Sequence, residues 1–169
     1  MASFRIEGGH KLSGEITPQG AKNEALQVIC ACLLTKEEVI IDNIPHIADI
    51  VQLIDLMQKM GVEVKEINRN KYSFKAQNID LDYIGSVDYN KRCISLRGSV
   101  MLSGPILLSF KSAILPQPGG DKIGRRHLDT HFQGFSKLGA TFNYDTENSL
   151  YRITAEELKG TYMLLDEAS

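Results

Sequence analysis

An internal repeat is the feature of this sequence that most restricts the folds open to it. The segment KMGVEV at 59–64 recurs as KLGATF at 137–142, 78 positions later. At the same spacing, IVQLIDLMQKMG parallels LDTHFQGFSKLG. Self-similarity at a fixed period indicates one structural unit used more than once, with each unit burying equivalent apolar positions. The chain is therefore expected to fold as stacked repeats.

The first repeat is expected to run helix, strand, helix and hairpin. Asn23–Leu34 and Ile50–Met60 carry apolar residues at helical spacing, with Asp49 as the expected N-cap of the second helix. Glu38–Asp42 lies between them and is a strand candidate. VEVKEI and KYSFKA alternate in polarity around the turn NRN, which indicates a hairpin.

The second repeat has a similar order, with a helix, a loop, a second helix and a hairpin. Arg97–Phe110 is expected to be a helix that is kinked or divided at Gly104-Pro105, because proline lacks the backbone N–H. Asp129–Leu138 is the second helix and ends at Gly139, and ATFNYD with LYRITA forms a hairpin around TENS. Mixed helices and hairpins of this kind place the chain in the α/β (α+β) class.

The segments outside these two repeats are too short to bury a core alone. Short strands are expected at Ser3–Glu7 and Gly14–Ile16, and TYMLLDEAS after Gly160 is interpreted as the start of a third repeat. The 169 residues are therefore expected to be part of a longer chain. The expected division is residues 1–17 in a second lobe and 18–169 in one lobe, with repeats at about 20–77, 97–155 and 160–169.

Composition excludes several function classes. A net charge of −2 argues against broad binding to nucleic acid or acidic membranes. The longest apolar run, Val28–Leu34, is far too short to span a membrane, and the N-terminus lacks the apolar core of a signal peptide. Three cysteines without metal-ligand spacing indicate buried thiols in a reducing compartment. We expect a cytoplasmic protein with no metal.

The stretch Leu115–His131, LPQPGGDKIGRRHLDTH, concentrates ionisable side chains in a loop. Its prolines and glycines exclude a continuous helix or a central strand. Alone, such a loop fits either a site for chemistry or a solvated charged turn. Lys22, at the start of a predicted helix, is similarly either an exposed lysine or, with the helix N–H groups beside it, a contact for an anion such as phosphate.

Three motifs together give the sequence a family resemblance. GAKNEAL at 20–26, LRGSVMLSGPIL at 96–107 and GGDKIGRRHLDTH at 119–131 resemble the enolpyruvyl transferases, specifically those that act on UDP-N-acetylglucosamine. The resemblance runs from FRIEGG to DEAS, which is less than half of a full-length member. It implies an "inside-out" α/β barrel whose lobes contain three repeats each. It also implies phosphoenolpyruvate and UDP-N-acetylglucosamine as substrates, peptidoglycan precursor synthesis as the process, and no cofactor.

Carried over by position, the resemblance implies a set of substrate contacts. Lys22 and Asn23 would contact phosphoenolpyruvate, Arg97 would bind the sugar nucleotide, and Arg126 would lie near both. The remaining implied contacts are His127, Leu128, Asp129 and Thr130 around the uridine, His131 just after them, and Glu167, Ala168 and Ser169 in a diphosphate-binding loop. Cations suit this reaction because it joins two multiply charged anions.

Asp121 departs from most of the family, which has a cysteine there that donates a proton and is alkylated by fosfomycin. Some members have aspartate, and we expect Asp121 to be the general acid, with Lys22 and Arg126 completing the catalytic set. Bound anions favour the protonated carboxyl that this role needs, whereas nearby cations oppose it. The alternative is a loop carboxylate that merely pairs with Lys122 or Arg125.

Two other functions stay open from the sequence. One is the 3-phosphoshikimate enolpyruvyl transferase, which shares the fold and phosphoenolpyruvate, although HLDTH at 127–131 resembles the stretch that serves a uridine. The other is a non-catalytic nucleotide-binding repeat module, which would not need polar residues at these spacings. In either enzyme the chain alone is expected to be inactive, because the family site lies between two lobes that close on the substrates.

Fosfomycin is expected to leave no covalent adduct on Gly119–Lys122, because the carboxylate at position 121 is not the thiolate that the drug alkylates. Mass spectrometry of peptides from the treated protein would check this, with a cysteine-containing family member treated in parallel as the positive control. A mass increase located on these four residues would contradict the prediction.

Overall fold

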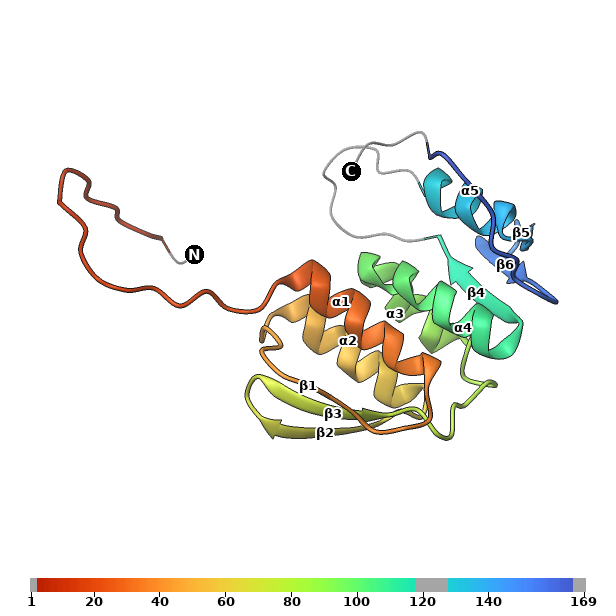
Figure 1. Cartoon of the computed structure of the whole chain (residues 1–169), viewed down its shortest axis with the longest axis horizontal. Coiled ribbons are helices and arrows are strands. Elements are labelled where there is room, and N and C mark those ends of the chain that lie inside the picture. The colour runs from red at the N-terminus through yellow and green to blue at the C-terminus, as the bar shows by residue number, and fades with distance from the viewer. Residues whose placement is uncertain (1–2, 118–127, 166–169) are drawn as a thin grey trace.

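The structure is a computed structural model that describes residues 3–117 and 128–165. Helices α1 to α4 form a central block, with one three-stranded sheet along one side and a second sheet, covered by α5, at the other (Figure 1). The N-terminal segment extends away from this body as a tail without secondary structure (Figure 1).

The first repeat has the predicted order of elements. In sequence they are α1 (Lys22–Ala31), a 3-10 turn (Cys32–Leu34), β1 (Val39–Ile41), α2 (Ala48–Lys59), β2 (Glu63–Asn68) and β3 (Lys71–Lys75). The sheet order is β1-β3-β2 and both pairings are antiparallel. The first helix is shorter than expected because the chain tightens into the 3-10 turn after Ala31, which leaves Leu34 half exposed.

The second repeat has the same topology. Its elements are α4 (Ser103–Phe110), β4 (Ser112–Pro116), α5 (Asp129–Lys137), β5 (Thr141–Asp145) and β6 (Leu150–Thr154), in the antiparallel order β4-β6-β5. A 3-10 helix, Arg97–Leu102, precedes α4, so the predicted division of 97–110 is confirmed, but the break falls between Leu102 and Ser103 rather than at Gly104-Pro105. Pro105 lies in the first turn of α4, where its missing N–H breaks no helical hydrogen bond.

The helices that lead into the two hairpins end in the same way. Gly61 and Gly139 adopt left-handed φ values of 92° and 103°. In each repeat the glycine N–H and the next N–H donate to carbonyls three and five positions earlier, at 2.9–3.0 Å. This pattern is a Schellman motif, which stops a helix and turns the chain back. The predicted helix stops at both glycines are confirmed.

Helix α3 (Val87–Ser95) lies between the repeats and was not predicted. Only Tyr89 and Cys93, one turn apart, are buried, so the helix carries too little apolar periodicity to be recognised. The Ser86 hydroxyl caps it by accepting from the Tyr89 N–H at 3.2 Å. Arg92 then ties α3 to α2 by an ion pair with Asp55.

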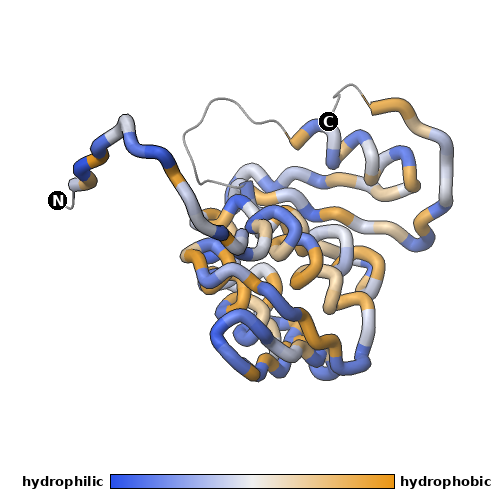
Figure 2. The backbone as a smooth tube through the Cα atoms, turned by 60° about the vertical axis from the view of Figure 1, so that its left-hand side comes forward, coloured by the Kyte–Doolittle hydropathy of each residue, from blue (hydrophilic) through white to orange (hydrophobic). Residues whose placement is uncertain are grey.

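The two strands expected at Ser3–Glu7 and Gly14–Ile16 are wrong for this structure. No residue from 3 to 17 lies in a strand, and Figure 2 shows this tail as a mixture of hydrophobic and hydrophilic residues. Its larger apolar side chains are at least 88% exposed: Phe4, Ile6, Leu12 and Ile16. Strands form only against a partner strand, and this tail lies away from both sheets. Its assignment to a second lobe stays a prediction.

One hydrophobic core runs through both repeats. Its fully buried members include Ile29, Leu53 and Phe74 from the first repeat and Leu107 and Ile153 from the second. Within residues 3–117 and 128–165, no single helix has the length and hydropathy of a membrane span; the bent helix pair 87–95 and 97–110 meets these criteria by length and composition only.

Substitution at the two helix-ending glycines should separate backbone strain from steric clash. Gly61→Ala should lower the free energy of unfolding by about 2–3 kcal/mol, because left-handed strain adds to a Cβ placed 2.3 Å from the Asn78 carbonyl oxygen. Gly139→Ala should cost about 1 kcal/mol, since the nearest atom to its Cβ is 3.3 Å away. Denaturant unfolding followed by circular dichroism measures both.

The control is Gly134→Ala in the middle of α5, where a Cβ meets nothing within 4 Å. This change should stabilise by about 0.5–1 kcal/mol through helix propensity. Equal losses for Gly61→Ala and Gly139→Ala would mean that the Asn78 carbonyl moves aside without penalty.

Candidate functional site

Five of the residues predicted to contact substrate line one cavity of about 260 Å³. The cavity lies where the N-terminal ends of α1 and α2 meet the 3-10 helix of the second repeat and the start of α5. Its described lining is Lys22, Asn23, Leu26, Gln27, Asp49, Arg97, Gly98, Val100, Met101, Leu128 and His131. Residues more than one hundred positions apart in sequence are thus brought together.

Helix α1 presents its positive end to this cavity. The helix begins at Lys22, after Ala21 in an extended conformation, so Lys22 and Asn23 occupy its first turn. The first N–H groups of a helix have no intrahelical acceptor, and the helix dipole favours an anion beside them. The predicted position of Lys22 at a helix N-terminus is confirmed, whereas its role as an anion contact stays a prediction.

Arg97 reaches the cavity through the 3-10 helix that it begins. This helix packs very closely on α1, because a Cβ built on Gly98 would lie 2.8 Å from a Leu26 methyl carbon. Leu26 and Val100 are both buried and form the apolar part of the lining. Two cationic side chains, Lys22 and Arg97, therefore line the same small cavity as the apolar side chains of Leu26 and Val100.

Asp49 is a cavity residue that the sequence did not identify as part of the site. Its carboxylate pairs with the Lys22 ammonium at 2.7 Å, and both side chains are a little over 40% exposed. The prediction that Asp49 caps α2 is wrong, because the helix starts at Ala48 with Ile47 as its N-cap. The only sequence signal was an acidic residue in a first helical turn, which suits the dipole of any helix.

The other predicted contacts divide into three groups. Leu128 and His131 line the cavity, whereas Asp129 and Thr130 begin α5 without lining it. Asp121, Arg126 and His127, with Glu167, Ala168 and Ser169, lie outside the described residues. The cavity as described can therefore bind an anion through a lysine, an arginine and a helix N-terminus.

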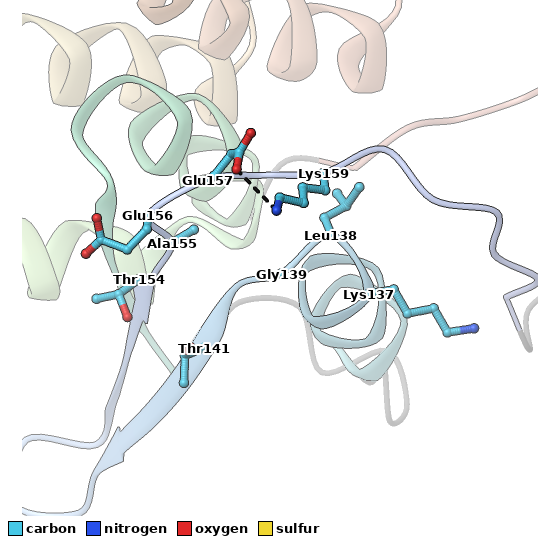
Figure 3. A pocket seen from close by; sticks show the side chains of 9 residues that line it. All are labelled: Lys137, Leu138, Gly139, Thr141, Thr154, Ala155, Glu156, Glu157 and Lys159. Carbon is cyan, nitrogen blue, oxygen red and sulfur yellow. Dashed lines mark ion pairs between the residues drawn. The ribbon is translucent and has the colours of Figure 1, made fainter.

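A larger hollow of about 690 Å³ lies elsewhere, between the end of α5 and the segment that follows β6 (Figure 3). Its charged groups include the ion pair between Lys159 and Glu157, at 3.4 Å, and both side chains are mostly exposed. It contains none of the predicted site residues. The equivalent segment of the first repeat, 76–80, also lines a hollow, of about 640 Å³. Apart from this segment the two linings differ, since the first hollow is completed by the end of α5 and the second by residues 33–36 and 109–110.

All three cysteine thiols are buried, which confirms their predicted placement. Burial raises the pKa of Cys93 from 9.0 to about 11 and that of Cys32 from 9.0 to about 11, and it raises the pKa of Cys30 further. None of them lines the cavity. Buried, protonated thiols that do not line the cavity are poorly suited to act there as nucleophiles or proton donors.

Metal-ligating side chains do not gather in the described ranges. Across residues 3–117 and 128–165, no group of three or more His, Cys, Asp or Glu is arranged to hold a metal ion.

Comparison with known sequences places the chain among carboxyvinyl transferases. Residues 6–169 match the family described as EPSP synthase (3-phosphoshikimate 1-carboxyvinyltransferase). Relatives named UDP-N-acetylglucosamine 1-carboxyvinyltransferase are 63% identical in Bacteroides fragilis and 56% identical in Porphyromonas gingivalis, over all of this chain. The chain spans 39% of the length of each of these curated relatives.

Solved structures show the same fold. The enolpyruvyl transferase NikO from Streptomyces tendae matches 89% of this chain and 32% of its own, with a TM-score of 0.66 and 19% identity. EPSP synthase from Acinetobacter baumannii matches 92% of this chain and 36% of its own, with a TM-score of 0.55 and 14% identity. The predicted enolpyruvyl-transferase fold is therefore confirmed.

The folded chain should react slowly with a thiol reagent such as Ellman's reagent at pH 8. A rise in pKa from 9.0 to about 11 leaves Cys93 and Cys32 with about 100-fold less thiolate than in the unfolded chain, and burial restricts access further. The stability contributed by these protonated thiols is present below pH 9.0 and is lost as the pH rises towards 11. Release of the coloured thiol, measured with and without guanidinium, checks the rate.

Unfolded chain in guanidinium is the control and should react rapidly at all three positions. A thiol that reacts at the unfolded rate in the native chain would show that its burial is not maintained in solution.

Proposed function

The chain belongs to the EPSP synthase family of enolpyruvyl transferases, and we propose from this that the whole protein transfers the enolpyruvyl group of phosphoenolpyruvate to UDP-N-acetylglucosamine. The acceptor is the 3-hydroxyl of the sugar, and inorganic phosphate is released. The acceptor is proposed from the relatives at 56–63% identity, which are named for that substrate.

The cavity at the ends of α1 and α2 is the observation that carries this proposal. Lys22, Asn23, Arg97, Leu128 and His131 were matched to substrate contacts through three separate motifs, and all five line the cavity. A repeat module without catalytic function has no physical need to bring two cations to one helix N-terminus.

The side chains have distinct tasks in the proposed reaction. The sugar hydroxyl gives its proton to a general base as its oxygen adds to the enol carbon that bears phosphate, while the neighbouring methylene gains a proton from Asp121. A proton is then removed from the new methyl group as the carbon–oxygen bond to phosphate breaks, which restores the double bond. Lys22, Arg97 and Arg126 offset the repulsion between the two anionic substrates throughout.

This reaction would supply the first committed intermediate of peptidoglycan precursors. The proposed setting is therefore cell wall biogenesis in the cytoplasm, with consequences for cell shape, division and the cell cycle. With aspartate at position 121, the enzyme is proposed to be insensitive to fosfomycin. No obligate protein partner is proposed.

Substrate titration and one substitution test the proposal in a chain extended to the length of the relatives. UDP-N-acetylglucosamine should bind in isothermal titration and shikimate 3-phosphate should not, because the uridine stretch is specific for a nucleotide. Asp121→Ala should lower turnover by at least about 100-fold, the usual value of a general acid, and leave sugar-nucleotide affinity within about twofold. Phosphate release measures turnover.

Asp145→Ala, at the last residue of β5 and outside the cavity lining, is the matched control and should leave both quantities unchanged. If shikimate 3-phosphate gave binding heat and UDP-N-acetylglucosamine gave none, shikimate 3-phosphate would replace UDP-N-acetylglucosamine as the proposed acceptor. Unchanged turnover in Asp121→Ala would remove the assignment of Asp121 as the general acid. Phosphate release by the 169-residue chain itself would contradict the expectation that this chain is inactive without the rest of the enzyme.

A further inference from the structure

The carboxylate of Asp49 is unexpected in a cavity that is otherwise suited to anions. Lys22, Arg97 and the end of α1 all favour a bound negative charge, whereas Asp49 repels one. Its presence therefore needs a reason other than direct contact with an anionic substrate. The reason lies in what Asp49 contacts, which is the ammonium group of Lys22 at 2.7 Å.

Lys22 is poorly held by its own helix. It is the first residue of α1, where the positive end of the helix repels an ammonium group. Its side chain is 44% exposed and has four rotatable carbon–carbon bonds, so many rotamers that point into solvent compete with the one at the cavity. A lysine in this position requires an external partner to occupy one conformation.

Asp49 is well placed to be that partner because its backbone is rigid. It lies in the first turn of α2, and the next residue, Ile50, is 1% exposed within the core. Helices α1 and α2 lie side by side in Figure 1 and start at the same end, so the carboxylate also offsets two positive helix ends. Its short side chain has few rotamers, and its oxygen fixes where the ammonium group can lie.

We propose that Asp49 is a positioning residue that holds the Lys22 ammonium group at the cavity, ready to contact the anionic groups of phosphoenolpyruvate. This inference rests on the proposed function for the identity of the ligand. The ion pair itself is a property of the chain without ligand. The two parts can therefore be tested separately.

A second ion pair in the same repeat provides a matched control. Lys71 pairs with Asp42 at 3.0 Å, again at the surface, and neither residue lines the cavity. Exposed pairs of this kind contribute little to stability. Asp49→Asn and Asp42→Asn should therefore melt at similar temperatures, and any difference in their effect on ligand binding reflects position.

The first experiment measures the reactivity of Lys22 in the 169-residue chain without ligand. Reductive methylation, read by mass spectrometry of the Lys22 peptide, should proceed several-fold faster in Asp49→Asn, because the ammonium group loses its ion pair with the Asp49 carboxylate. Asp49→Glu should restore part of the protection. Asp42→Asn should accelerate Lys71 and leave Lys22 unchanged. An unchanged Lys22 rate in Asp49→Asn would overturn the proposal.

The second experiment measures kinetics in a chain extended to the length of the relatives. Asp49→Asn should raise KM for phosphoenolpyruvate about tenfold and KM for UDP-N-acetylglucosamine less than twofold, with partial recovery in Asp49→Glu and no change in Asp42→Asn. Equal increases in KM for both substrates would overturn the proposal, because the carboxylate would then affect only the overall structure. A lower KM for phosphoenolpyruvate would also overturn it, because the carboxylate would then act only by repelling the anionic substrate. Absence of activity in the unsubstituted protein would instead contradict the proposed function, while the methylation rates still decide whether Asp49 holds Lys22.

Discussion

Burial of the apolar faces of the two repeats against each other is the constraint on which the rest of this structure depends. A three-stranded antiparallel sheet with a helix pair cannot enclose a core by itself, so the first repeat is completed by the second. The buried contact between Leu26 of α1 and the 3-10 helix at Gly98 is one result. The cavity is another, since its lining comes from both repeats and forms only when they pack.

The charges of the candidate site follow from how the helices are oriented in that packing. Helices α1 and α2 start at the same end, and their dipoles therefore add at the cavity. Lys22 and Arg97 increase the positive potential, and Asp49 reduces it locally while engaging Lys22. Burial separately keeps the three cysteine thiols protonated and away from the cavity. The proposed anion site and the protected thiols both depend on the packing of the helices, the first because that packing forms the cavity and the second because it buries the sulfur atoms.

Local signals predicted the elements well where they were strong, and failed where the structure depends on distant partners. Alternating and helical patterns identified both hairpins and most helices, and Gly61 and Gly139 marked helix ends because the left-handed conformation there suits glycine. Helix α3 was missed because only Tyr89 and Cys93 face the core. The N-terminal strands were wrong because apolar alternation describes a strand only when a partner strand is beside it.

The sequence by itself determined the repeat, the order of elements within it and the family, because these are recorded in spacing and in motifs that need no distant contact. Through the same motifs it also indicated Lys22, Asn23 and Arg97 as substrate-binding residues. Only the tertiary structure decided that these residues share one cavity with Asp49 as a member. An ion pair between positions 22 and 49 has no local sequence pattern, because it depends on two helices lying side by side, and that arrangement is set by the packing of the whole core.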